Sequence, residues 1–151
     1  MDILPACERI VEELRTVHSE ADIRFEPTKS VIGLFDGARL KQVFSNLIGN
    51  AIQDGDRDAP LTVTLDANHD SALFSVHNTD NVIPKDLVPF IFNPMGRYSP
   101  DHVAEKGPQY SLGLGLFIAA QIVECHGGSI VVTSNAEAGT TFAVTLPLQA
   151  A

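Results

Sequence analysis

Apolar residues recur at intervals of three and four along three segments of the chain, and this spacing predicts an amphipathic helix in each. The first segment is residues 5–18, and the second is residues 37–54, with Asp36 placed to cap its start. The third lies within residues 111–128, where a glycine-rich turn leads into the helix and Gly127 suits its end. The side chains expected to face the core are, helix by helix, Cys7, Ile10, Val11, Leu14 and Val17; Leu40, Val43, Phe44, Leu47, Ile48 and Ala51; and Leu114, Ile118, Ile122 and Cys125.

Six shorter segments, apolar or alternating between apolar and polar positions, are predicted to be strands. Only three residues separate the first two segments, so we expect these to form a hairpin. The order helix, two strands, helix, two strands, long loop, helix, two strands predicts one mixed or antiparallel sheet with the helices packed on one face. That architecture is a two-layer α+β sandwich. The six segments are residues 23–27, 31–36, 61–67, 72–78, 129–134 and 140–148.

The composition is that of a soluble globular domain. The chain has 151 residues, of which 44% are apolar and 19% charged, and we expect one domain over residues 1–151. The net charge of −9 argues against a nucleic-acid surface. No run of 18 apolar residues or signal peptide is evident, so we expect a cytoplasmic segment without membrane contact. Cys7 and Cys125 are too few for a disulfide framework or a structural zinc site.

An uncharged stripe of amide side chains follows one face of the helix predicted over residues 37–54. Asn46, Asn50 and Gln53 stand at positions i, i+4 and i+7, where an exposed helix face normally carries charged residues. Amide oxygens are acceptable ligands for Mg²⁺, and amide N–H groups can donate to phosphate oxygens. The pattern is equally typical of a solvated polar face, and the sequence leaves both interpretations open.

A second candidate site is the GLGL turn ahead of the third helix. Gly113 and Gly115 let the backbone approach a ligand closely, because neither residue carries a Cβ. The helix that follows points unpaired N–H groups and a partial positive charge at that ligand, which suits phosphate. Glycines before a helix also serve simply as turn and packing residues, so this alternative stays open as well.

Five motifs in one order extend these observations over most of the chain. They are QVFSNLIGNAIQ, NTDNVIP, PFIFNPM, SLGLGLFIAAQIVECHGGSIVVTS and GTTFAVTLP. Together they resemble the catalytic ATP-binding domain of bacterial sensor histidine kinases, whose Bergerat fold is shared with gyrase, the Hsp90 chaperones and the MutL proteins. The resemblance covers nearly the whole chain, and the segment from GLGL to the end is its most specific part.

The resemblance implies a function in two-component signalling. Such a domain binds Mg²⁺–ATP and donates the γ-phosphoryl group to a histidine of a dimerisation domain, and a response regulator acts downstream. None of the five histidines here has the setting of that phosphoacceptor, so we expect structural roles for them and a chain that is a fragment of a longer kinase. The parent protein is then either soluble or membrane-anchored.

The resemblance also implies roles for individual polar residues. Asn50 matches an asparagine that ligates Mg²⁺. Asn46 falls where the hydrolytic relatives carry a general-base glutamate, and an amide there fits a domain that should not activate water. Gln53 takes the place of a frequent lysine that reaches phosphate, and Thr140 matches a threonine that helps to hold adenine.

The nucleotide is expected to lie under a lid formed by residues 84–111, a proline-rich stretch. Arg97 and Lys106 are the candidate lid cations for phosphate, with a solvated surface position as the alternative for each. The residues that match the phosphate-cradling box are Ser111, Leu112, Gly113, Leu114, Gly115 and Leu116.

The adenine-recognition segment departs from the usual pattern of the family, which is Asp-x-Gly-x-Gly-Ile, and follows at Asn78 and Ile83 the pattern Asn-x-Gly-x-Pro-Ile that is common in phytochrome-like members. Asn78 replaces the aspartate and can still accept a hydrogen bond from the adenine amino group, and Ile83 is retained. Asp80 and Val82 replace the two glycines, and Asp80 adds a side chain and a charge where only glycine is expected. Two alternatives follow: a degenerate docking module of the same fold that binds nucleotide weakly or not at all, and a serine kinase of the anti-sigma-factor type.

Overall fold

The computed structural model describes residues 1–26, 30–54, 59–79, 91–92 and 112–149, with the backbone alone described at 53–54 and 112–114. Within these residues, helices and strands alternate as the sequence predicted for most of the chain. The elements are α1 (Leu4–Val17), β1 (Ile23–Phe25), α2 (Gly37–Asp54), β2 (Leu61–Ala67), β3 (Ser71–Asn78), α4 (Leu112–Cys125), β4 (Ser129–Asn135) and β5 (Gly139–Pro147).

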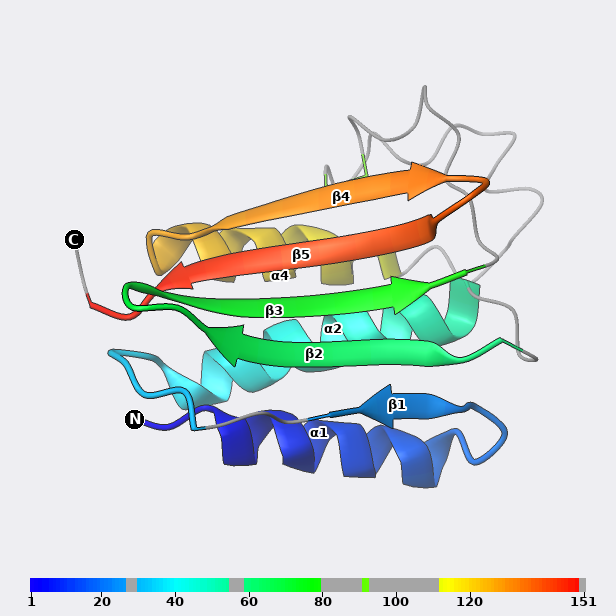
Figure 1. Ribbon diagram of the computed structural model, residues 1–151, viewed down its shortest axis with the longest axis horizontal. Coiled ribbons are helices and arrows are strands. Elements are labelled where there is room, and N and C mark those ends of the chain that lie inside the picture. The colour runs from blue at the N-terminus through cyan, green and yellow to red at the C-terminus, as the bar shows by residue number, and fades with distance from the viewer. Residues whose placement is uncertain (27–29, 55–58, 80–90, 93–111, 150–151) are drawn as a thin grey trace.

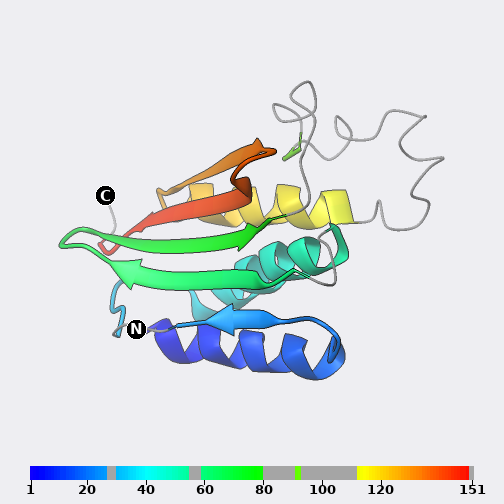
Figure 2. The same ribbon diagram turned by 45° about the vertical axis from the view of Figure 1, so that its right-hand side comes forward.

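The strands form one sheet in the order β1-β2-β3-β5-β4. β1 runs parallel to β2, and the other neighbours are antiparallel. The helices cover one face of this sheet, with α2 between α1 and α4 (Figures 1 and 2). The predicted two-layer α+β sandwich with a mixed, mostly antiparallel sheet is therefore confirmed.

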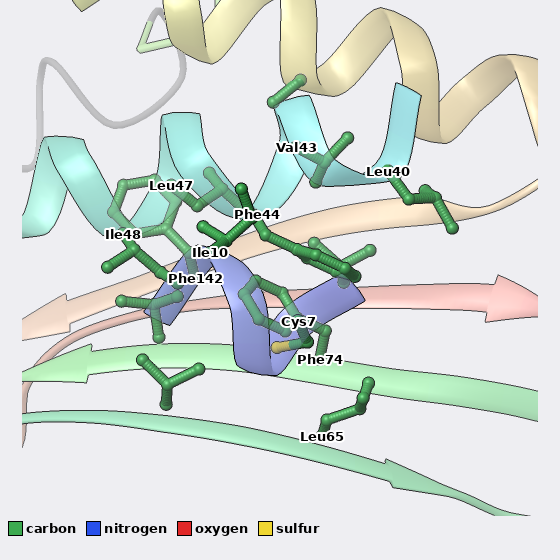
Figure 3. Close-up of a cluster of buried hydrophobic side chains, with 14 of the residues drawn as sticks. Cys7, Ile10, Leu40, Val43, Phe44, Leu47, Ile48, Leu65, Phe74 and Phe142 are labelled. Atoms are coloured by element: carbon green, nitrogen blue, oxygen red, sulfur yellow. The ribbon is translucent and has the colours of Figure 1, made fainter. Parts of the chain in front are cut away.

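The core lies between the sheet and the helices, and α2 is at its centre. The predicted stripe of α2, from Leu40 to Ala51, is buried at every position. The ring of Phe44 packs on the ring of Phe74 from β3, with their centroids 4.7 Å apart (Figure 3). Burying a side chain of this size stabilises the fold by about 1.5–3 kcal/mol. The predicted cap is also present, since the Arg39 N–H donates to Asp36 Oδ1 at 3.2 Å.

The predicted hairpin of residues 23–27 and 31–36 is wrong. β1 pairs with β2, beginning at Ile23 opposite Leu61, and residues 31–36 form no strand beyond an isolated bridge between Ile32 and Asp2. Parallel neighbours need a long crossover connection, and α2 supplies it here. Local alternation of apolar residues could not reveal a partner that lies beyond an entire helix.

The predicted buried face of α4 is wrong in part. Ile122 is buried, but Ile118 is 36% exposed and Cys125 is exposed. The core-facing side chains include instead Leu116, Ala119 and Val123. Because α4 is apolar on nearly every side, the spacing of apolar residues alone could not identify which face packs against α2.

Candidate functional site

The predicted site residues that the structure describes gather at one end of the molecule. This end is formed by the second half of α2, the end of β3, the start of α4 and the turn between β4 and β5, on the right in Figure 1. α2 supplies Asn46 and Asn50, β3 ends at Asn78, and Gly115 lies in the first turn of α4. Thr140 of β5 pairs with Asn78 across the sheet. Residues far apart in the sequence therefore lie at the same end of the described fold.

Three polar side chains are buried in the part of the chain that the structure describes, and all three lie at this end. They are Asn50, Asn78 and Thr140, with exposed fractions of 3%, 6% and 2%. Among the described residues, the Oδ1 atoms of Asn50 and Asn78 have no hydrogen-bond partner. A buried acceptor left unpaired costs about 1–3 kcal/mol, so each atom needs an explanation, and a ligand that donates or coordinates supplies one.

Asn46 has a different environment from Asn50. Its Nδ2 donates to the backbone carbonyl of Gly115 at 3.0 Å, and this bond ties α2 to the first turn of α4. A Cβ added at Gly115 would lie 3.6 Å from Asn46 Cγ, which is an ordinary contact. Packing among the described residues therefore leaves room for a larger side chain at this position. Leu116 is buried, so only its backbone can face a ligand.

The turn between β4 and β5 holds the end of β3 in place. Thr140 Oγ1 lies 2.7 Å from Ser134 Oγ, and either hydroxyl can be the donor. Gly139 has a φ of +82°, and a Cβ there would lie 2.1 Å from the backbone oxygen of Asn78. Sequence reasoning gave Gly139 no role. The available signals were its place at the end of the segment NAEAG between two predicted strands and at the start of the motif GTTFAVTLP.

Two histidines have structural roles, as the sequence predicted. His126 Nε2 accepts from the Asp36 N–H at 3.1 Å, and its Nδ1 donates to the Ile122 carbonyl at 2.9 Å. This ring therefore joins the start of α2 to the end of α4, and the two hydrogen bonds together require the tautomer with its proton on Nδ1. His77 Nε2 contacts the carbonyl of Ala138 at 2.6 Å, next to the turn that holds the end of β3.

Several predicted site residues lie outside the described part of the chain. Within the proposed lid segment 84–111, Ile91 and Phe92 are described: Ile91 is buried, and Phe92 meets Phe142 edge-on at 6.1 Å. The backbone of residues 112–114 begins α4. The residues not described are Asp80, Val82, Ile83, Arg97, Lys106 and Ser111, together with the side chains of Gln53, Leu112 and Leu114.

The polar side chains described in the site are amides and hydroxyls, so none of them carries a charge. The start of α4 adds the positive end of a helix dipole, a feature that favours anions. No cluster of three histidine, cysteine or acidic side chains that could hold a metal occurs among the described residues. A cation here would need amide oxygens, such as the unpaired Oδ1 of Asn50, together with oxygens of its own ligand. No described helix is long and apolar enough to cross a bilayer.

Residues 35–150 match the family of histidine kinase-, DNA gyrase B- and HSP90-like ATPases. The chain belongs to this family. The resemblance inferred from the motifs is thus confirmed.

Among curated members, the heme sensor protein HssS of Staphylococcus haemolyticus is 39% identical over 108 residues, covering 72% of this chain and 22% of HssS. The sensor protein SrrB of Staphylococcus aureus is 33% identical over 126 residues, covering 83% of this chain and 21% of SrrB. The chain spans about a fifth of the length of these relatives.

Solved members of the ATPase family share the fold over the whole chain. The nucleotide-free catalytic domain of histidine kinase ThkA aligns with a TM-score of 0.82 at 26% identity, covering 99% of this chain and 94% of that domain. The mycobacterial sensor histidine kinase MprB gives 0.78 at 24% identity, covering 100% and 97%. Full-length ShkA in complex with AMPPNP gives 0.80 at 22% identity, covering 100% and 31%. The last two likenesses show the fold alone.

Proposed function

We propose that residues 1–151 are the catalytic ATP-binding domain of a longer sensor histidine kinase. The domain binds Mg²⁺–ATP and donates the γ-phosphoryl group to a histidine of the kinase's dimerisation domain, with a response regulator downstream. The observation that carries this proposal is the pair of buried, unpaired amide oxygens of Asn50 and Asn78, which lie at the same end of the molecule. The match to the ATPase family supports it.

Each described residue has a task in this proposal. Asn78 Oδ1 accepts from the base, with Thr140 beside it, and Asn50 Oδ1 is a hard ligand suited to Mg²⁺. When bound, the cation neutralises charge on the phosphates. Gly115 and the start of α4 present backbone N–H groups to the phosphates. From the sequence alone the proposal adds Gln53 as a neutral contact for phosphate, residues 84–111 as the lid, and Arg97 and Lys106 as the candidates for its cation.

Asn46 accounts for the choice of phosphoryl acceptor. Its amide donates to Gly115 and carries no carboxylate, so it cannot take a proton from an attacking water. Without a general base at this position, the domain positions ATP for an incoming imidazole, which is already a nucleophile when neutral. Catalysis therefore rests on placement and charge neutralisation, as in other phosphoryl transfers.

The proposal is tested by calorimetry of the chain with Mg²⁺–ADP, with Asn50→Leu and Asn68→Leu as a matched pair. Asn50→Leu removes an unpaired buried oxygen, so we expect nucleotide binding to be lost while the melting temperature is unchanged or higher. Asn68 lies in the turn between β2 and β3, where its Oδ1 accepts from Asp70 and Ser71. Asn68→Leu should therefore lower the melting temperature and leave binding unchanged.

Two outcomes would overturn the proposal in different ways. No heat and no thermal shift at millimolar nucleotide would favour the docking module, for which Asp80 and Val82 argue from the sequence. Transfer of phosphate to a serine of the partner, detected as an acid-stable product, would favour a serine kinase. Phosphohistidine is acid-labile, so acid treatment of the labelled partner separates the two chemistries.

A further inference from the structure

Asn78 is the residue of the proposed site that would face the base, and its side chain is an amide and not a carboxylate. It ends β3 with 6% of its surface exposed, and its Oδ1 has no hydrogen-bond partner in the described part of the chain. Its neighbour across the sheet is Thr140, whose hydroxyl lies 2.7 Å from that of Ser134 with either oxygen able to donate. The buried polar side chains described at this position are thus all neutral, and each can both donate and accept.

An amide differs from a carboxylate in one decisive respect. A carboxylate only accepts hydrogen bonds, so it pairs with the 6-amino group of adenine. Guanine and hypoxanthine have a carbonyl at this position, and the carboxylate cannot form a hydrogen bond with it because both groups are acceptors. An amide has oxygen and nitrogen ends of nearly the same shape, and a half-turn about χ2 exchanges them. In one orientation Asn78 accepts from a 6-amino group, and in the other it donates to a 6-carbonyl.

We infer that the base site at Asn78 accepts 6-oxopurine nucleotides as well as adenine nucleotides. The inference rests on the proposed nucleotide site and concerns its selectivity. A site whose hydrogen bonds a ligand cannot make rejects that ligand by factors of roughly 10⁴. Because the Asn78 amide can form a bond with either kind of purine, we expect the affinities for ADP and for inosine diphosphate to differ by no more than about tenfold.

Inosine diphosphate is the appropriate probe, because at the position that faces Asn78 its base has a carbonyl where adenine has an amino group. It also lacks the 2-amino group of guanine, so it introduces no additional bulk. The 151-residue chain is titrated with Mg²⁺–ADP and Mg²⁺–IDP by calorimetry, together with the variants Asn78→Asp and Asn68→Asp. Asn68 is a matched control on the turn between β2 and β3, and its Oδ1 acceptor is retained in the aspartate.

We expect the native chain and Asn68→Asp to bind both nucleotides, and Asn78→Asp to lose at least about a hundredfold in affinity for IDP relative to ADP. Binding of ADP without IDP by the native chain would overturn this inference and leave the proposed function intact. Binding of neither would overturn the proposed function itself. If Asn78→Asp does not fold, the side-chain amide signals of Asn78 provide an independent measurement by NMR. The chemical shifts of its amide protons should move downfield when IDP binds and not when ADP binds. Identical shifts with both nucleotides would contradict the proposal that Asn78 donates to one base and accepts from the other.

Discussion

Gly139 allows the close approach of the β4–β5 turn to the end of β3, and Gly139→Ala tests this role. Its φ of +82° lies in the left-handed region, where an alanine costs about 1–2 kcal/mol. The added Cβ would also lie 2.1 Å from the oxygen of Asn78 and 2.7 Å from Thr79 Cα. Both are backbone atoms that cannot rotate away, so the overlap adds about 1–3 kcal/mol of strain.

The free energy of unfolding of Gly139→Ala should therefore fall by about 2–5 kcal/mol. For a chain of this size each kcal/mol lowers the melting temperature by about 2–4 °C, so circular dichroism should show a fall of about 4–20 °C. The affinity for Mg²⁺–ADP should fall as well, because relief of the overlap displaces the backbone of Asn78.

Gly127→Ala is the matched control. Gly127 has a similar φ of +78°, but a Cβ there would meet only Pro147 Cγ at 3.5 Å, an ordinary contact. This variant should lose about 1–2 kcal/mol and keep its affinity for nucleotide. Equal losses in stability for the two variants, or unchanged nucleotide affinity in Gly139→Ala, would refute the argument that close packing against β3 is what requires glycine.

Three further predictions concern other parts of the chain. Asn46→Asp places a carboxylate against the Gly115 carbonyl, so the free energy of unfolding in urea should fall by about 1–3 kcal/mol. Calorimetry should also show a weaker affinity for Mg²⁺–ADP. Unchanged stability and unchanged affinity would contradict the hydrogen bond between the two helices. Burial raises the pKa of the Cys7 thiol to about 12, whereas Cys125 is exposed, so a thiol reagent should label one cysteine in the native chain and two in urea. Burial alone would raise the pKa of Asp2, but two backbone N–H groups bond to its carboxylate and lower the pKa below its ordinary value. Its stabilising contribution is therefore complete above that ordinary value and is lost as the pH falls through the lowered pKa, so Asp2→Asn should flatten the acid limb of the stability profile; an unchanged limb would contradict this.

The sequence predicted those features whose cause is local. The stripe of α2 and its cap at Asp36 follow from spacing and from side-chain chemistry close in the sequence, and both are present. The parallel pairing of β1 depends on a strand beyond α2, and the packed face of α4 depends on which of several apolar sides α2 can approach. Neither cause is local, so the pairing of β1 was predicted wrongly and the buried face of α4 was predicted correctly, among its described side chains, only at Ile122.

The candidate site also combines features that the sequence could predict with features that it could not. The motifs selected Asn50, Asn78 and Thr140, and the structure adds that these are the buried polar side chains of its described part. The absence of partners for two of the three could not be predicted, because it depends on every surrounding element. Gly139 escaped notice for a related reason: its conformation is local, but the need for it arises from the backbone of β3.

The hydrogen bond from Asn46 to Gly115 joins the middle of α2 to the first turn of α4, and the bond from Asp36 to His126 joins the residue before α2 to the residue after α4. Sliding α4 by one turn along α2 would break both hydrogen bonds, so the two bonds specify a single register between these helices. Gly115 and His126 are eleven positions apart, which corresponds to roughly 16 Å of helix. A displacement of the first turn of α4 along α2 would therefore strain both hydrogen bonds, and not the nearer one alone.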